Sequence, residues 1–244
     1  MKGIILAGGG GTRLSPLTKV TSKQLLPIYN KPMIYYPLET LMRGGITEIL
    51  IITAPDRAGD FLRLLGSGKE LGVKFTYEIQ DNPEGLPQAF TIGENFIGED
   101  NVALILGDNI FEDDFSEQIK SFKGGGHVFA KKVPDPERFG VVKFDESKKA
   151  QQIVEKPKEH ISDYAVTGLY LYDNRVVEAT KKLAKSARDE YEIVDLHNFY
   201  LEKGELTVST VEGKWLDAGT FDSLLEANLL TAKREGSSLF KGKR

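Results

Sequence analysis

Cysteine is absent from the 244-residue chain, which excludes disulfide frameworks, thiolate zinc sites and cysteine nucleophiles. Histidine is scarce as well. His127, His160 and His197 lie far apart, without the spacing of metal ligands, and we interpret each as a surface or structural residue. A histidine-based metal site is therefore not expected.

A surplus of one charge is also missing. The 32 basic and 36 acidic residues leave a formal charge of −4, whereas a nucleic-acid-binding protein is expected to show a clustered basic surface. No apolar run reaches the roughly 20 residues of a membrane span. The apolar run after Met1 breaks at glycine before it is long enough for a signal peptide. We expect a cytoplasmic protein with no nucleic-acid partner and no membrane partner.

Apolar strands alternate with amphipathic helical stretches over the first 110 residues, without an internal repeat or a Pro/Ser-rich linker. Strands are expected at 3–7, 48–54, 74–80 and 101–109, and helices at 33–45, 56–72 and 87–96. Such alternation requires right-handed crossovers between mostly parallel strands. The first part of the chain therefore reads as βαβ units.

The rhythm changes after about residue 125. Strands at 127–133, 139–145, 150–157 and 165–173 follow one another with short turns, which predicts antiparallel strands beside the parallel ones. A helical run at 175–203, strands at 206–211 and 214–219 and a last helix at 220–234 complete the chain. The sequence predicts one α/β domain, 1–244, of Rossmann-like type, with three layers and a mixed central sheet flanked by helices.

Four consecutive glycines, Gly8 to Gly11, follow the first strand and precede Thr12 and Arg13. The loop fits neither the dinucleotide fingerprint G-x-G-x-x-G nor the Walker A ending Gly-Lys-Ser/Thr. Glycines still let backbone N–H groups converge on an anion, and Arg13 and Lys23 add a planar fork and a point charge for phosphate oxygens. We interpret the loop as a polyphosphate site; a flexible loop with solvated basic residues is the alternative.

Two carboxylates are candidate ligands for a magnesium ion. Asp108 ends the strand "ALILG", and Asp217 follows Trp215 and Leu216. Magnesium takes one or two protein carboxylates and leaves its other positions to phosphate and water. A turn or helix-capping role is the alternative for either acid.

The third candidate is "IVEKP", where Glu155 and Lys156 close a predicted strand. The carboxylate could accept hydrogen bonds from sugar hydroxyls and the lysine could hold a phosphate; an ordinary charge pair is the alternative. Gly140 and Gly168 are positions where backbone could approach a sugar ring, or simple bulges.

Taken together, an ordered set of motifs resembles the sugar nucleotidyltransferase family, and is most similar to members that use dTTP and glucose 1-phosphate. The set runs from residue 3 to about 230 and comprises "GGGGTRLSPLT", "SKQLLPIYNKPMIYYPLETLM", "QDNPEGLPQAF", "LGDNIF", "DPERFGVV", "EKP", "YAVTGLYLYD" and "WLDAGT". Phe139 and Asp189 depart from the tyrosine and glycine that are usual in the family.

The resemblance implies a nucleotidyltransferase fold, with a nucleotide-binding part at about 1–110 and a sugar-binding and oligomerisation part at about 111–244. It implies Mg²⁺-dependent transfer of a thymidylyl group from dTTP to glucose 1-phosphate, by in-line attack at the α-phosphorus. The products would be dTDP-glucose, the first intermediate of dTDP-rhamnose-type synthesis for cell-surface polysaccharides, and pyrophosphate. It also implies a homotetramer.

The resemblance assigns roles position by position. Catalytic roles fall on Arg13, Lys23 and Asp108. Nucleotide binding falls on Gly8, Gly9, Gly10, Gly11, Thr12, Arg13, Lys23, Gln24, Gln80, Gly85 and Asp108. Sugar-phosphate binding falls on Asn109, Gly140, Glu155, Lys156, Val166 and Arg188. The metal ligands would be Asp108 and Asp217, with Trp215 packed in support.

Two alternatives stay open. A uridylyltransferase making UDP-glucose would bind uracil, which differs from thymine by one methyl, and a non-catalytic sugar-nucleotide sensor could share the fold. A sensor would be expected to lose the loop arginine, the lysine or an acid, and this chain keeps them. On the last helix, Leu225, Leu229 and Leu230 are assigned to the core rather than to a subunit contact.

Overall fold

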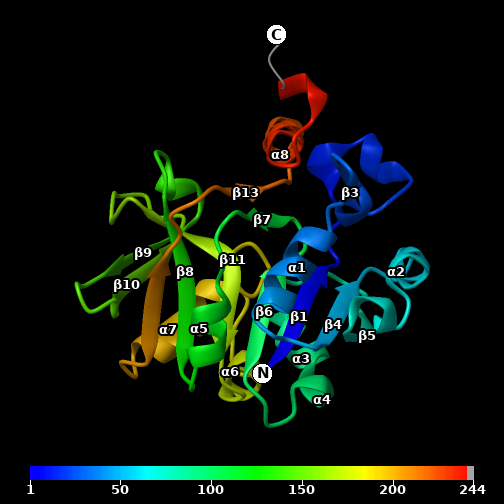
Figure 1. Ribbon diagram of the computed structural model, residues 1–244. Coiled ribbons are helices and arrows are strands. Elements are labelled where there is room, and N and C mark those ends of the chain that lie inside the picture. The colour runs from blue at the N-terminus through cyan, green and yellow to red at the C-terminus, as the bar shows by residue number, and fades with distance from the viewer. Residues whose placement is uncertain (241–244) are drawn as a thin grey trace.

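The structure is a computed structural model that describes residues 1–240. A nine-stranded mixed sheet runs through it, with helices on both faces (Figure 1). The sheet contains β1 (Lys2–Ala7), β4 (Glu48–Thr53), β5 (Lys74–Ile79), β6 (Val102–Leu106), β8 (Gly126–Lys132), β9 (Gly140–Phe144), β10 (Ala150–Glu155), β11 (Tyr164–Tyr172) and β12 (Leu206–Thr210). The predicted α/β class with a mixed sheet is confirmed.

The helices and the strands outside the main sheet complete the architecture. The helices are α1 (Tyr35–Arg43), α2 (Ala58–Leu65), α3 (Gln88–Ile92), α4 (Glu94–Ile97), α5 (Ser116–Ser121), α6 (Arg175–Thr180), α7 (Ile193–Leu201) and α8 (Phe221–Arg234). Two strand pairs stand apart, β2 (Pro27–Ile28) with β3 (Lys31–Pro32), and β7 (Asn109–Phe111) with β13 (Trp215–Asp217). Single 3₁₀ turns occur at Thr12–Leu14, Leu17–Lys19, Lys23–Leu25, Lys69–Leu71, Pro136–Arg138 and Ser238–Phe240.

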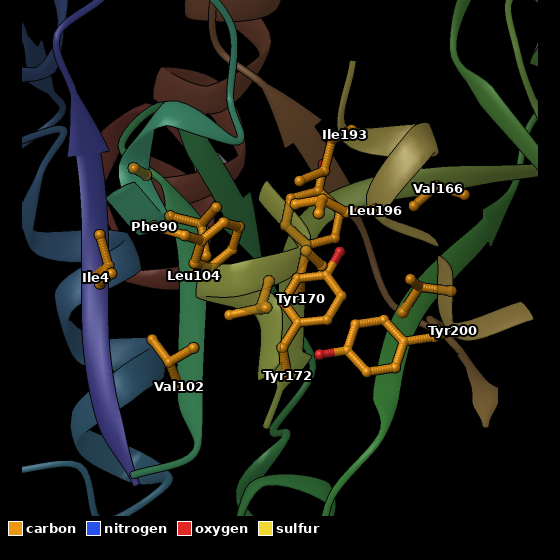
Figure 2. Close-up of a cluster of buried hydrophobic side chains, with 14 of the residues drawn as sticks. Ile4, Phe90, Val102, Leu104, Val166, Tyr170, Tyr172, Ile193, Leu196 and Tyr200 are labelled. Carbon is orange, nitrogen blue, oxygen red and sulfur yellow. The ribbon is translucent and has the colours of Figure 1, made fainter. Parts of the chain in front are cut away.

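Strand alternation divides the core into two layers, one on each face of the sheet. Ile4 and Leu6 of β1 pack into the layer that α3, α4, α6 and α7 cover, while Ile5 and Ala7 pack into the layer under α1, α2 and α5. Because successive side chains of a strand point to opposite faces, a continuously apolar strand is what such a central position requires. Figure 2 shows the first layer, where Tyr172 of β11 stacks on Tyr200 of α7 with ring centroids 5.4 Å apart.

The parallel and antiparallel parts of the sheet meet at β6. Strands β6, β1, β4 and β5 are neighbours in that order, and their pairing is parallel, which the alternation of strands and helices predicted. On the other side of β6 lies β11, which pairs with it antiparallel and also pairs with β8 and β9. The pairing of β11 with β8 is interrupted between Val166 and Tyr170. The strand thus changes partners along its length, and the second half of the chain extends the sheet of the first.

Three predicted helices are shorter than expected. The run at 56–72 ends at Gly66, whose φ of 56° leaves the helical region, and the run at 87–96 is divided at Gly93. The run at 175–203 is wrong as a single helix: α6 and α7 are separated by a loop in which Asp189 has φ 58°. A glycine takes such a positive φ without steric cost, so the family's usual glycine fits this position better than aspartate.

Helix α8 lies apart from the main sheet, next to β13 (Figure 1). Its first turn is closed by a capping box in which Thr220 Oγ1 accepts from Ser223 N at 3.2 Å. The assignment of Leu225 and Leu229 to the core is wrong, because they are 59% and 47% exposed, whereas Leu230 packs on a small cluster beneath the helix. In the part of the chain that the structure describes, no helix combines the length and the apolar character needed to cross a membrane.

Candidate functional site

A cavity of about 470 Å³ opens at the carboxyl ends of the parallel strands and continues across β11 into the second half of the chain. Open α/β sheets bind their ligands at this edge. Most of the candidate residues line it: Gly9, Arg13, Lys23, Gln24, Gln80, Gly85, Asp108, Asn109, Gly140, Glu155, Lys156, Val166, Arg188 and Asp217. Segments far apart in sequence therefore form one site.

The glycine loop forms the end of this cavity that offers hydrogen-bond donors and positive charge to an anion. Gly11 has φ 60°, which favours glycine, and its carbonyl accepts from Thr18 Oγ1 at 2.9 Å. Gly9 and Arg13 line the cavity, whereas Gly8, Gly10, Gly11 and Thr12 belong to the same loop without lining it. The loop offers backbone N–H groups and one exposed guanidinium to an anion.

Lys23, which is partly buried, and the buried Asp108 form an ion pair beside the loop. Burial alone would raise the pKa of Asp108, but the charge and hydrogen bond of Lys23 outweigh it and hold this pKa below its usual value. Asp108 is therefore ionised near neutral pH and already has a cation beside it.

Asp217, which lies more than 100 residues later in the chain, is next to Asp108. Strand β13 pairs with β7 in a register that sets Asp217 opposite Asn109, and Ala218 N donates to the Asp108 carbonyl at 3.0 Å. Burial, followed by the negative charge of Asp108, raises the pKa of Asp217 to about 6. Its Oδ1 is buried and has no hydrogen-bond partner in residues 1–240.

This acid pair fits a divalent cation. An unpartnered buried carboxylate oxygen next to a second carboxylate is the kind of donor set that a hard cation accepts. Within residues 1–240, no group of three or more His, Asp or Glu side chains could hold a metal by itself. A metal here would have two protein carboxylates and would need its remaining ligands from substrate phosphate and water.

The wall of the cavity that follows β5 contains Gln80 and Gly85. Gln80 is 3% exposed and follows β5 directly; a Cβ on Gly8 would lie 2.3 Å from its Oε1, so only glycine leaves room for this amide. Gly85 has φ 116° and bridges to Tyr191. An amide and a close backbone strand suit the edge of a flat heterocycle.

At the opposite end of the cavity, one carboxylate lies near several cationic side chains. Glu155 ends β10, and its Oε1 lies 3.3 Å from Arg188 Nη2 and 3.6 Å from Lys156 Nζ. Lys156 has φ 42°, a strained conformation for a lysine, and its N–H donates to the Phe139 carbonyl at 3.0 Å. The arrangement offers acceptors for hydroxyl groups next to positive charge for a phosphate.

Some of the lining was not anticipated from the sequence. Arg138 adds a further cation to the lining, and Tyr170 and His197 form part of the wall. Tyr170 could have been found, since it stands two residues after Gly168 on the same face of β11. Trp215, expected to pack in support of Asp217, also donates from Nε1 to Asn109 Oδ1 at 2.6 Å.

Residues 2–234 match the protein family described as nucleotidyl transferase. The chain belongs to the nucleotidyl transferase family. Its fold and its cavity, with a glycine loop and two acids at the carboxyl ends of the parallel strands, agree with this membership.

Individual relatives of this nucleotidyl transferase are close. It is 56% identical over 234 residues to the glucose-1-phosphate thymidylyltransferase of Neisseria meningitidis serogroup A, and 53% identical over 233 residues to that of Mycolicibacterium smegmatis. Each alignment covers 93% of this chain and 81% of the relative.

Solved structures agree. A protein from Bacillus anthracis, provisionally assigned as a glucose-1-phosphate thymidylyltransferase and crystallised with sucrose, has a TM-score of 0.89 at 51% identity, with 94% of both chains covered. A UDP-glucose pyrophosphorylase complexed with UDP-glucose has a TM-score of 0.85 at 26% identity, and the match covers 96% of this chain and 98% of that one.

Proposed function

We propose that this nucleotidyl transferase is a glucose-1-phosphate thymidylyltransferase, which transfers a thymidylyl group from dTTP to glucose 1-phosphate and releases pyrophosphate. One observation carries the proposal: a single cavity joins an amide-lined slot, a cationic glycine loop with two acids, and a carboxylate among cations. Relatives with 53–56% identity have this activity in their names.

The chemistry needs no general base, because a sugar phosphate is already anionic at neutral pH. The two tasks are to overcome repulsion between anions and to align the attacking oxygen with the α-phosphorus. Lys23 would neutralise charge at the α-phosphate, and Arg13 would stabilise the departing pyrophosphate. Both are ordinary roles for a point charge and a planar fork.

The metal of this proposal is Mg²⁺, held by Asp108 and Asp217. When bound, it would supply positive charge against the phosphate oxygens. The support is the buried, unpartnered Oδ1 of Asp217 beside an ionised Asp108.

The sugar phosphate is assigned to the opposite end. Lys156 and Arg188 would hold its phosphate, and Glu155 would accept hydrogen bonds from ring hydroxyls. Gly140, Val166 and Asn109 would contact the hexose. The support is that these residues line the same cavity as Gln80, and that β10, which ends at Glu155, lies at the opposite end of the sheet from β5.

A uridylyltransferase is the second candidate, since a UDP-glucose pyrophosphorylase shares the fold at 26% identity. Thymine and uracil differ by one methyl, which is worth only ~1 kcal/mol in a pocket. We expect use of both dTTP and UTP, with dTTP preferred.

The deciding experiment is pyrophosphate release with glucose 1-phosphate and Mg²⁺, comparing dTTP, UTP, dCTP, ATP and GTP. Lys23→Ala should lose turnover by about two to three orders of magnitude, as removal of one preorganised charge does elsewhere. Lys19→Ala is the matched control, since Lys19 is exposed and lies outside the cavity lining. Binding of dTTP without turnover under all conditions would favour the sensor.

The proposal extends to a cytoplasmic homotetramer. Nucleoside triphosphates are available in the cytoplasm, and Phe221, Leu225 and Leu229 form an exposed apolar stripe at i, i+4 and i+8 of α8 that suits a contact between copies. Light scattering after gel filtration measures the oligomeric state directly.

A further inference from the structure

A chain of hydrogen bonds behind the cavity starts at the backbone of Glu84. Its N–H donates to Gln88 Oε1 at 3.1 Å. A backbone N–H can only donate, so the oxygen and nitrogen of the Gln88 amide are not interchangeable. The other end agrees, because Gln88 Nε2 faces the carboxylate Oε2 of Glu84 at 3.4 Å, and Lys185 Nζ holds that carboxylate at 2.7 Å.

The same Gln88 oxygen accepts a second hydrogen bond, from Gln80 Nε2 at 2.6 Å. If the Gln80 amide turned over, two oxygens would face each other and a buried bond would be lost. Gln80 is therefore fixed with its nitrogen toward Gln88 and its oxygen toward Gly8. Gln88 is not among the residues that line the cavity, whereas Gln80 is.

The orientation of such an amide matters for pyrimidines. Thymine and uracil present an N–H at position 3 beside a carbonyl oxygen, whereas cytosine presents a bare nitrogen beside an amino group. An amide that is free to turn over pairs with either edge. An amide held in one orientation pairs with one edge and opposes the other.

We propose that Gln88 is a positioning residue for base selection: by fixing the Gln80 amide, it makes the site accept thymine or uracil and reject cytosine. This inference rests on the proposed function, which assigns Gln80 to the base. The 5-methyl group is not read by the amide, so the mechanism excludes dCTP without separating dTTP from UTP.

The test compares kcat/KM for dTTP, UTP and dCTP in Gln88→Met, which keeps length but removes the acceptor. The ratio of dTTP to dCTP should fall by about tenfold, chiefly through improved use of dCTP, because one hydrogen bond no longer favours a single orientation. The ratio of dTTP to UTP should stay unchanged. Gln88→Glu in a Glu84→Gln background keeps an acceptor toward Gln80 Nε2 and toward the backbone N–H of residue 84, without two facing carboxylates, and should retain the wild-type ratio.

Gln118→Met is the matched control, since Gln118 is a partly buried glutamine on α5 that does not line the cavity. If Gln88→Met does not fold, Gln88→Ala removes the same acceptor without bulk. Equal losses for dTTP and dCTP, or an unchanged ratio in these variants, would overturn the proposal.

Calorimetric binding of dTTP and dCTP without sugar separates this inference from the proposed function. A wild type that prefers dTTP in binding, but turns over no nucleotide with glucose 1-phosphate, would reject the function. Loss of that preference in Gln88→Met would still support the role of Gln88.

Discussion

A Cβ on Gly85 would lie 2.2 Å from the carbonyl oxygen of Tyr191, so the backbones of these two residues touch. Tyr191 N also donates to the Glu84 carbonyl at 2.8 Å. The contact joins the loop after β5 to the loop before α7. The wall of the cavity that contains Gln80 and Gly85 is thereby attached to the segment that contains Arg188.

Gly85→Ala should destabilise the protein by at least about 2 kcal/mol, because φ is 116° and no space exists for the methyl group. Gly59→Ala is the opposite control: Gly59 lies within α2 with nothing within 4 Å of the added Cβ, and alanine there should stabilise by about 0.5–1 kcal/mol. Urea unfolding of both variants measures the two effects. Equal behaviour would contradict the close contact.

Asp217→Asn should stabilise the ligand-free protein while it removes activity. The wild-type carboxylate is buried next to Asp108, which costs free energy that a neutral amide does not. The thermal midpoint without ligand should rise, and the part of the dTTP-induced rise that requires Mg²⁺ should disappear. A variant that is less stable than wild type, or that keeps the Mg²⁺ effect, would count against the acid pair as a metal site.

Glu155→Ala should raise the KM for glucose 1-phosphate with a smaller change in kcat, because the carboxylate is assigned to the sugar rather than to the reacting phosphates. The KM should rise about tenfold, as expected for the loss of one hydrogen bond that involves a charged group. Glu159→Ala, at an exposed position four residues away, is the control. Steady-state kinetics with varied sugar phosphate give both constants, and a pure loss of kcat would reassign Glu155 to the chemical step.

Stability should fall in mild acid because of His197. The ring is fully buried, its Nδ1 shares a hydrogen bond of 2.7 Å with the Tyr172 hydroxyl, and burial lowers its pKa to about 3. The unfolded chain binds a proton below about pH 6.5 and the folded chain does not, so stability is lost as pH falls from 6.5 toward 3, by about 2 kcal/mol at pH 5.

His197→Gln should therefore show a flatter dependence of the urea midpoint between pH 7.5 and 5 than wild type. Part of the slope remains, since burial also lowers the pKa of His127, to about 4. His160→Gln, at an exposed position, should leave the wild-type dependence in place. An unchanged slope in His197→Gln would show that this ring does not govern acid stability.

The parallel part of the fold could be predicted because its signals are local. Buried strands such as β1 and β6 are continuously apolar, and glycines mark their ends. The loop between α6 and α7 could not be predicted, since its residues have acceptable helix propensity and only tertiary contacts such as Tyr191 with Glu84 draw it out of the helix.

The candidate site was predictable where a strand end or a glycine marks it, as at Asp108 and Gly85. Pairing of Asp217 with the strand after Asp108 depends on β13 and β7, which are 106 residues apart and share no local pattern. Gln88 escaped notice for a different reason. Its role lies in a hydrogen bond behind the wall, and nothing in the helix period distinguishes it from a surface glutamine.

The ion pair of Lys23 with Asp108 gives the pocket an internal counterion. If a nucleotide binds as proposed, Lys23 would exchange this carboxylate for phosphate oxygens, so one side chain would serve two partners in turn. The ligand-free protein should then bind metal cations weakly, because Lys23 competes with them for Asp108. Affinity for the metal and affinity for the triphosphate should rise together, each making the exchange easier for the other.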